Sequence, residues 1–183
     1  MVSGEASAWP RVVRMPWVVP VAAVLAVATF VHLGHDANAA LWAAVQIVLV
    51  ALAGYDFATR RLPNVVTLPV AALAIVLRAL FERGSLQEIA IAGAVSFVVF
   101  FLLAIVVRGG FGMGDVKLAS MLGFLLGSAV ISALAIGIIA GGVVSAILLA
   151  SSRATLHSSI AYGPYLAFGG AVAILAFNPP ALV

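Results

Sequence analysis

The sequence predicts an all-α fold, a polytopic transmembrane bundle of about six to seven helices, and two observations support this prediction. Hydrophobic residues make up 65% of the 183 residues and charged residues only 8%, whereas about a quarter of a soluble protein is charged; the mean hydropathy is +1.27. The apolar residues also form stretches close to the roughly 20 residues that cross a bilayer. Because backbone polar groups in lipid must be hydrogen-bonded within their own segment, each stretch is expected to be helical.

The apolar stretches give the expected order of segments. Arg11 and Arg14 precede the first stretch, which could be read as a secretory signal. No clear small-x-small cleavage site followed by a polar mature region appears, and we expect a retained helix. The fifth stretch is too long for one span, and Gly127-Ser128 predicts a break into residues 116–126 and 129–150. We expect a cytoplasmic N-terminal segment, residues 1–16, and one transmembrane domain, residues 17–183. The stretches are residues 17–33, 39–55, 65–81, 89–107, 116–150 and 160–177.

Charge and residue usage exclude several kinds of site. Nine basic and six acidic residues give a net charge of +3, and these are too few positive charges for the basic patch that binds nucleic acid. The chain has no cysteine, which excludes disulfides, thiolate zinc sites and a cysteine nucleophile. The histidines are His32, His35 and His157, and we expect neither a metal site nor a cofactor.

Basic residues in the short loops predict the orientation of the chain. With a cytoplasmic amino terminus, Arg83 falls on the outer side with Arg78 near it, and most other basic residues fall inside. Asp56 and Asp115 then share the cytoplasmic boundary of a multi-pass protein of the inner (plasma) membrane. The basic residues on the cytoplasmic side are Arg11, Arg14, Arg60, Arg61, Arg108, Lys117 and Arg153. We interpret the arginines of this set that follow helix ends as anchors at lipid phosphates.

Small residues are scattered through the later stretches. Gly137 and Gly141 form a Gly-x-x-x-Gly pattern, and small residues let membrane helices approach closely. We interpret the pattern as packing inside the bundle, not as a dimer contact, and the sequence gives no oligomeric state.

Asp56 and Asp115 are the candidate catalytic residues because their carboxyl groups occur at the edges of apolar stretches. Ionisable side chains near hydrocarbon are energetically costly and are rare outside functional sites. Two carboxyl groups that share one proton can hydrolyse an amide: the ionised one takes a proton from water and the protonated one donates to the carbonyl oxygen. The surrounding patterns are Tyr55-Asp56 followed by Arg60-Arg61-Leu62-Pro63-Asn64, and Gly112-Met113-Gly114-Asp115-Val116-Lys117.

The helix ends predict that the two carboxyl groups differ. Asp56 closes the helix before it, where the negative end of the helix dipole disfavours a second negative charge. Asp115 opens the helix after it, where free N–H groups favour one. We therefore expect Asp56 to be the more readily protonated partner in the free enzyme.

These patterns resemble the type IV prepilin peptidases, membrane aspartic peptidases that remove leader peptides from prepilins. The resemblance covers about residues 39–177 and also includes the late segment Ile160-Ala161-Tyr162-Gly163-Pro164-Tyr165-Leu166-Ala167-Phe168. It implies that Asp56 and Asp115 form the catalytic pair at the cytoplasmic face, without a metal. The implied partners are the lipid bilayer and a prepilin-like precursor with a basic leader and an apolar helix.

One departure from the larger members narrows this expectation. Those members resemble bifunctional enzymes with an added cytoplasmic domain that carries paired cysteines and is linked to N-methylation. This chain has no cysteine and is similar instead to the short, peptidase-only form of tight-adherence (Flp) pilus systems. Methylation of the product would then need another protein.

Two other functions use the same residue types. Presenilin and signal peptide peptidase relatives resemble this chain in Tyr-Asp, Gly-x-Gly-Asp and a Pro-Ala-Leu, here Pro180-Ala181-Leu182, but we attribute that tripeptide to chance. A proton- or ion-coupled transport component also uses intramembrane carboxylates. It would be expected to hold them at the membrane midplane, not at helix ends.

The two glycines before Asp115 in the second motif are expected to support the substrate. Gly112 and Gly114 lack a Cβ and would let a turn or an extended peptide pass close to Asp115. Gly163 and Pro164, with Tyr162 and Tyr165, are expected to start the last helix and to pack against the site, with an interfacial aromatic anchor as the alternative interpretation of that segment.

Three polar or turn residues complete the candidate site. Pro63 suits the first turn of the next helix, where its missing N–H is not needed. Asn64 is expected to donate to a carboxylate or to satisfy the backbone at the helix start. Lys117 lies two positions after Asp115, so on a helix it points away from that carboxylate, and we expect it to bind substrate or phosphate.

Overall fold

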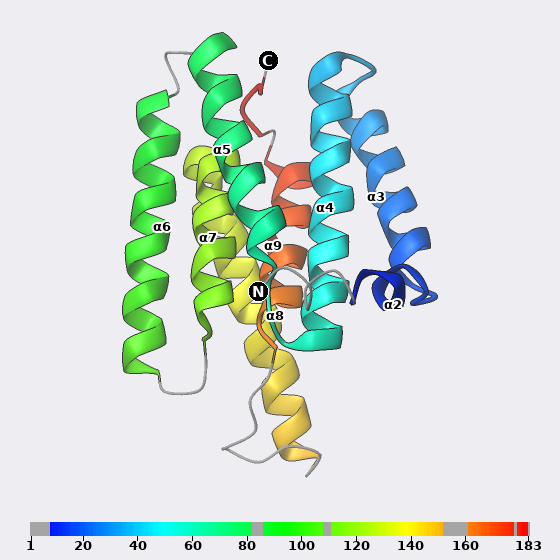
Figure 1. Cartoon of the computed structure of the whole chain (residues 1–183), viewed down its shortest axis with the longest axis vertical. Helices are drawn as coiled ribbons and strands as arrows, with labels where there is room; N and C mark the ends of the chain where they lie inside the picture. Colours follow the sequence, from blue (N-terminus) through cyan, green and yellow to red (C-terminus); the bar gives the residue numbers. More distant parts are fainter. Residues whose placement is uncertain (1–7, 82–85, 108–110, 152–160, 178, 183) are drawn as a thin grey trace.

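The computed structural model describes residues 8–81, 86–107, 111–151, 161–177 and 179–182, and this part of the chain is helical without strands (Figure 1). A short helix, α2, precedes the bundle, and a 3₁₀ turn, η2, lies between α7 and α8. The helices are α2 (Trp9–Val13), α3 (Val18–Leu33), α4 (Ala37–Thr59), α5 (Asn64–Phe81), α6 (Leu86–Val106), α7 (Met113–Leu126), η2 (Gly127–Ala129), α8 (Val130–Ala150) and α9 (Gly163–Ala176). The prediction of an all-α bundle with about six to seven main helices is confirmed.

The helices run alternately up and down, so that every second connection lies at the same end of the bundle (Figure 1). Four segments are long and apolar enough to cross a membrane: α4, α5, α6 and the continuous stretch Met113–Ala150. The protein is therefore a multi-pass membrane protein. The expected break in the long stretch occurs at Gly127, whose φ of 57° is in the left-handed region that favours glycine. The chain reverses there, and α8 returns beside α9 and extends below the other helices in Figure 1.

Local capping explains where α4 begins and ends. The Asp36 carboxylate accepts a hydrogen bond from the Ala39 N–H (2.8 Å), which satisfies one of the free donors at the helix start. At the other end Arg60 has a φ of 53°, and its N–H donates to the Asp56 carbonyl (2.7 Å). This left-handed residue stops the helix one turn after Asp56 and sends the chain into the short connection to α5.

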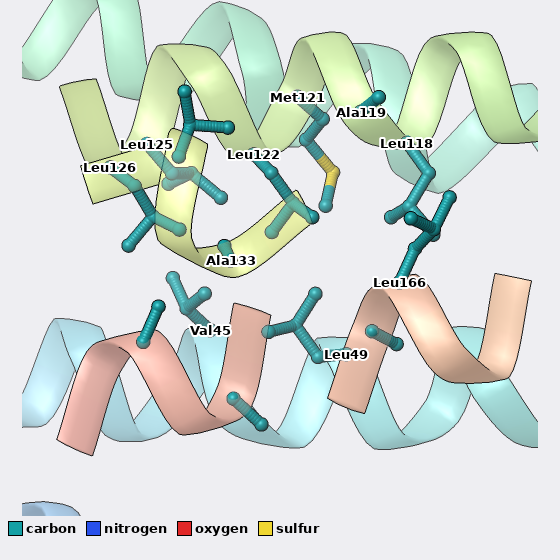
Figure 2. Packing of buried hydrophobic residues seen from close by; sticks show 14 of the residues in the cluster. Val45, Leu49, Leu118, Ala119, Met121, Leu122, Leu125, Leu126, Ala133 and Leu166 are labelled. Atoms are coloured by element: carbon teal, nitrogen blue, oxygen red, sulfur yellow. The ribbon is translucent and has the colours of Figure 1, made fainter. Parts of the chain in front are cut away.

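The centre of the bundle is formed by α4, α7 and α9, with the other helices around them. Figure 2 shows leucine side chains of these three helices meeting, among them Leu49, Leu122 and Leu166. These side chains are almost fully buried. In addition, the buried Gln46 of α4 donates to the Ala171 carbonyl of α9 (3.1 Å). Because lipid is as apolar as leucine, the fit between these helices and such interhelical hydrogen bonds stabilise them together more than exclusion from water does.

Glycines set the close contact between α8 and α9. A Cβ on Gly137 would lie 2.9 Å from the Tyr165 carbonyl oxygen, and one on Gly141 would lie 2.8 Å from the Tyr162 ring. The Gly-x-x-x-Gly pattern therefore packs inside this chain, as predicted from the sequence. Gly169 on α9 fits against the α8 backbone in the same way.

The described part of the N-terminal segment contains a short helix that the sequence analysis did not predict. Residues Trp9–Val13 form α2, which packs on the lower ends of α3 and α4. Val12 is fully buried, and the Trp9 and Tyr55 rings lie 4.8 Å apart. The sequence did not predict this helix because five residues are too short to produce a periodic pattern.

The opposite end of the bundle is closed by Arg78 and the C-terminal residues. Arg78 is fully buried, and its guanidinium donates to the Leu125 carbonyl (3.1 Å) and to the Pro180 carbonyl (3.2 Å). Leu182 is buried, and its N–H donates to the Asn38 side chain (2.7 Å). The tripeptide that resembles presenilin relatives thus lies far from the ends of α4 and α7 that carry the aspartates (Figure 1).

Several basic residues used in the sequence prediction of orientation lie outside the described residues. These are Arg83, Arg108 and Arg153. The side chains of Arg60 and Arg61 are exposed at the lower end of the bundle, as expected for anchors at a membrane surface.

Candidate active site

The structure brings Asp56 and Asp115 together at the lower end of the bundle. Asp56 is in the last turn of α4, and Asp115 is in the first turn of α7. Their side chains are only 5% and 7% exposed, and they are close enough for the charge on one to act on the other. Two ionised carboxylates so placed repel each other, so a single shared proton is the favoured state of the pair.

The helix start holds Asp115 in place. Its carboxylate accepts a hydrogen bond from the Gly112 N–H (2.8 Å), and its own N–H donates to the Gly112 carbonyl (3.0 Å). This is half of a capping box, since glycine has no side chain to complete the other half. A charge-assisted hydrogen bond at the positive end of a helix favours the ionised form of the carboxyl group.

Asp56 has a different environment. A Cβ added to Gly163 at the start of α9 would lie 2.6 Å from the Asp56 Oδ2 atom, so the Gly163 backbone lies directly against this carboxyl group. Oδ2 is buried, and within the described residues it has no hydrogen-bond partner. A buried carboxyl oxygen without a donor is better suited to the neutral, protonated form than to the charged one.

Gly163 and Pro164 occupy the positions that the sequence predicts for them. They form the first turn of α9, where the missing N–H of Pro164 costs no hydrogen bond. Gly163 is buried against Asp56, so this segment is part of the site and more than an aromatic anchor at the interface.

Phe111 and Tyr162 also border the site. Sequence reasoning placed Tyr162 in the segment expected to pack against the site, but it did not select Phe111. Their rings lie 4.5 Å apart, and Tyr162 is within electrostatic reach of Asp115. The sequence signal was position, because Phe111 directly precedes Gly112 and Tyr162 directly precedes Gly163. An aromatic residue beside a membrane helix end has a common alternative explanation as an interface anchor, so the sequence could not decide its role.

The residues at the start of α5 lie beside the first turn of α7. Lys117 donates from Nζ to the Asn64 Oδ1 atom (2.8 Å), and this pair is exposed. Asn64 thus makes a contact that differs from both sequence expectations, because its oxygen accepts from a lysine.

Two further positions refine the sequence predictions. Pro63 is the residue before α5, and its carbonyl accepts the first helical hydrogen bonds, from Val66 and Thr67 (both 3.2 Å). A Cβ on Gly114 would lie 3.2 Å from the Leu62 Cβ, so the space beside Gly114 is filled by the connection between α4 and α5. A Cβ on Gly112 would meet only ordinary contacts, which leaves that side of Asp115 open to a close neighbour.

Metal ligands and grooves are considered only among the described residues. In the part of the chain that the structure describes, no group of three or more His, Cys, Asp and Glu side chains lies together. A groove of about 520 Å³ runs between α6 and α8, and it is lined mainly by apolar side chains such as Val95, Phe100 and Ile138. Asp56 and Asp115 are not part of its lining.

Comparison with known proteins gives the family of the chain. Over 150 residues the chain is 28% identical to the prepilin leader peptidase/N-methyltransferase of Stutzerimonas stutzeri, an alignment that covers 79% of this chain and 52% of that protein. The chain thus spans about half the length of this curated relative. No solved structure matches the chain significantly. The model of the type IV leader peptidase family matches residues 43–150, more than half of the chain and both aspartates. The chain therefore belongs to the type IV leader peptidase family.

Proposed function

We propose that this protein is a membrane-embedded aspartic endopeptidase that removes the leader peptide from type IV prepilin-like precursors. One observation carries the proposal: Asp56 and Asp115, from two different helices, lie at the same end of the bundle within electrostatic reach of each other. Family membership supplies the class of reaction, and the curated relative is named for prepilin leaders. The substrate would carry a basic leader followed by an apolar helix in the same membrane.

The surroundings of the two carboxyl groups support unequal roles. Asp115 accepts the Gly112 N–H at the start of α7, which favours the ionised form and suits a general base. Asp56 has a buried oxygen without a donor in the described structure and suits the protonated, acidic role. This assignment agrees with the helix-dipole argument from the sequence.

The proposed reaction needs only these two groups and water. The Asp115 carboxylate takes a proton from a water molecule held between the pair while Asp56 donates its proton to the carbonyl oxygen of the scissile peptide bond. The water oxygen bonds to the carbonyl carbon and gives a neutral tetrahedral intermediate. The Asp56 carboxylate then takes a hydroxyl proton back, Asp115 gives its proton to the leaving nitrogen, and the C–N bond breaks. Both residues finish in their starting protonation states.

We place the cut at the cytoplasmic boundary of the plasma membrane, with the amino terminus of the chain inside the cell. The exposed Arg60 and Arg61 and the basic α2 lie at the same end as the carboxyl pair. Positive residues are enriched on the cytoplasmic side of membrane proteins. The basic leader of a precursor would remain on that side when its apolar helix lies in the bilayer.

The structure gives less support to the two rival functions. A transport component would hold its carboxylates near the membrane midplane along a path, whereas Asp56 and Asp115 are in terminal helical turns at one end of the bundle. In a presenilin-type protease Pro180-Ala181-Leu182 would be near the aspartates, but here the Pro180 carbonyl is bound to Arg78 at the opposite end. We do not extend the N-methyltransferase activity in the relative's name to this chain, because the alignment covers only 52% of that protein.

Co-expression with a precursor tests the proposal. The precursor should have a Lys/Arg-rich leader and an apolar stretch, and cleavage is followed by the size and new amino terminus of the product. Asp56→Asn and Asp115→Asn should each abolish cleavage while the protein still inserts into the membrane. Asp36→Asn is the matched control, because it changes an aspartate that caps the far end of α4. If either single Asn variant keeps normal cleavage, the aspartic peptidase assignment is wrong.

A further inference from the structure

A row of aromatic rings links the candidate site to the surrounding helices. The Phe100 and Phe111 ring centroids lie 5.3 Å apart, and those of Phe111 and Tyr162 lie 4.5 Å apart. Tyr162 and Tyr165 continue the row at 6.0 Å. The middle contact joins two parts of the chain that are far apart in sequence, one just before α7 and one just before α9.

Each ring of this middle pair is next to a glycine that contacts one of the aspartates. Phe111 precedes Gly112, whose N–H binds the Asp115 carboxylate at 2.8 Å. Tyr162 precedes Gly163, whose backbone lies against the Asp56 carboxyl group. The ring contact is therefore a short physical connection between the backbone that holds one carboxyl group and the backbone that supports the other.

We propose that Phe111 and Tyr162 form an aromatic clasp that sets the relative position of the two carboxyl groups, and that both are positioning residues for the reaction. This inference rests on the proposed peptidase function and deepens it. Amide hydrolysis by a carboxyl pair depends on holding one water between the two groups, and a misplacement of about 1 Å can cost roughly 10²-fold in rate. The clasp acts on that distance without touching the reacting atoms.

The clasp is anchored on helices that carry neither aspartate. The Tyr162 ring sits in a notch on α8, because a Cβ on Gly141 would lie 2.8 Å from the Tyr162 Cε1 atom. Phe111 packs edge-on against Phe100 of α6. Fixing the two rings from opposite sides restricts their motion, which is the condition for precise placement of the groups they support.

The hydroxyl of Tyr162 offers a competing role, since a tyrosine near a carboxylate could donate a proton itself. The positioning role and the proton-donor role predict that different variants lose activity. A clasp depends on the ring and tolerates Tyr162→Phe, whereas a proton donor does not. The conservative variant therefore separates them.

The test measures kcat and KM for cleavage of a purified precursor by Tyr162→Ala, Phe111→Ala, the double variant and Tyr162→Phe. We expect the two alanine variants to lower kcat by about 10 to 10²-fold with KM changed by less than about threefold. Tyr162→Phe should stay within about threefold of the parent. The double variant should be little worse than either single one, because one contact is lost in all three.

Phe97→Ala is the matched control. Phe97 stacks on Phe101 along the outside of α6, both are 39% exposed, and neither belongs to the row of rings at the site. Its kcat should be within about twofold of the parent value. Gly141→Ala provides a second approach that keeps both rings and only displaces Tyr162, and it should lower kcat in the same way. If the alanine variants do not fold, Gly141→Ala and Phe111→Leu carry the test.

Three results would overturn the clasp: unchanged kcat in the alanine variants, a change confined to KM, or a Tyr162→Phe variant as slow as Tyr162→Ala. These outcomes are distinct from failure of the peptidase assignment. Inactive Asp56→Asn and Asp115→Asn variants with a fully active Tyr162→Ala would reject the clasp alone. Active aspartate variants would reject both.

Discussion

The two ends of this bundle both contain charged side chains, but the contacts around those side chains differ. At the upper end in Figure 1, the buried Arg78 guanidinium binds the Leu125 and Pro180 carbonyls, and Glu88 accepts the Ser128 N–H (2.9 Å) beside the turn at Gly127. At the lower end, two carboxyl groups are buried side by side. Asp115 accepts a hydrogen bond from the Gly112 N–H, and the Gly163 backbone lies against the Asp56 carboxyl group.

This difference supports the proposed division between a charge that stabilises the fold and two carboxyl groups that serve the reaction. Arg78 joins α5, the end of α7 and the C-terminal residues, so its contacts explain its burial. The carboxyl pair places two like charges together, and one of its buried oxygens has no donor in the described structure. Its burial therefore does not stabilise the fold in the way that the burial of Arg78 does. Groups held in an unfavourable environment by the surrounding fold are typical of functional sites.

The largest expected effect is on catalysis by the carboxyl pair. Asp56→Asn and Asp115→Asn should each lower kcat by about 10³-fold or more, and the double variant should be no slower than the slower single variant, because the groups act as a unit. Thermal unfolding in detergent should show equal or greater stability, because each change leaves a single carboxyl group and so removes the like-charge repulsion within the pair. A multiplicative loss in the double variant would contradict a shared mechanism.

The pH dependence of kcat gives the next largest effect. At low pH both carboxyl groups are protonated and the base is lost; at high pH both are ionised and the acid is lost. The rate should therefore fall on both sides of an optimum, approaching tenfold per pH unit on each limb. Unfolding measured at the same pH values controls for loss of structure. A rate that does not change on either side would contradict a dyad that shares one proton.

Gly163→Ala tests whether the reaction depends on the close packing of the α9 backbone against Asp56. The new Cβ would lie 2.6 Å from the Asp56 Oδ2 atom and must displace the carboxyl group. We expect kcat to fall by about 10 to 10²-fold, since small displacements at a reacting centre are costly. The matched control is Gly142→Ala on α8, where a Cβ meets nothing within 4 Å. Equal activity of the two variants would show that Asp56 tolerates the displacement.

Arg78→Met should lower the stability of the fold and leave kcat unchanged, the reverse of the effect expected for the aspartate variants. Two buried carbonyl groups lose a donor, so we expect stability to fall by about 1–3 kcal/mol. The kcat of the folded fraction should be unchanged, because Arg78 lies at the far end of the bundle. Thermal unfolding and activity per folded molecule measure the two quantities separately. A large fall in kcat without loss of stability would remove the distinction between the two ends.

The smallest effect is expected at the exposed contact between Lys117 and Asn64. Lys117→Met removes the 2.8 Å hydrogen bond, but exposed polar pairs contribute at most about 1 kcal/mol. Stability and kcat should both remain close to those of the parent protein. A larger increase in KM, with kcat unchanged, would instead support the expectation that Lys117 binds the substrate.

The sequence predicted much of this protein because its strongest signals are local. Hydropathy identified the main helices, and Gly127-Ser128 marked the reversal between α7 and α8. Residues at helix boundaries singled out Asp56, Asp115, Gly163 and Pro164 as site candidates. Each of these inferences uses only a residue and its near neighbours in the chain.

Helix α2, the Asn64 contact and the aromatic neighbours of the site were decided by the tertiary structure. A five-residue helix is too short to give a pattern, and it is stabilised by Val12 and Trp9 packing on α4. The partner of Asn64 depends on how α5 and α7 lie side by side. No local rule could select Phe111, or decide whether Tyr162 packs on the site or anchors the interface, because aromatic residues at helix ends also serve as membrane anchors.

By itself, the sequence determined the class of the molecule and the approximate course of its main helices, and it selected the two acidic residues as candidates. Hydropathy and basic residues fix the depth of a helix end in the bilayer, so the sequence could predict that Asp56 and Asp115 share one boundary. Depth does not fix which helices are neighbours. That choice depends on interhelical packing, such as Gly141 against Tyr162 and Gly163 against Asp56, and so only the tertiary structure brought the carboxyl groups together.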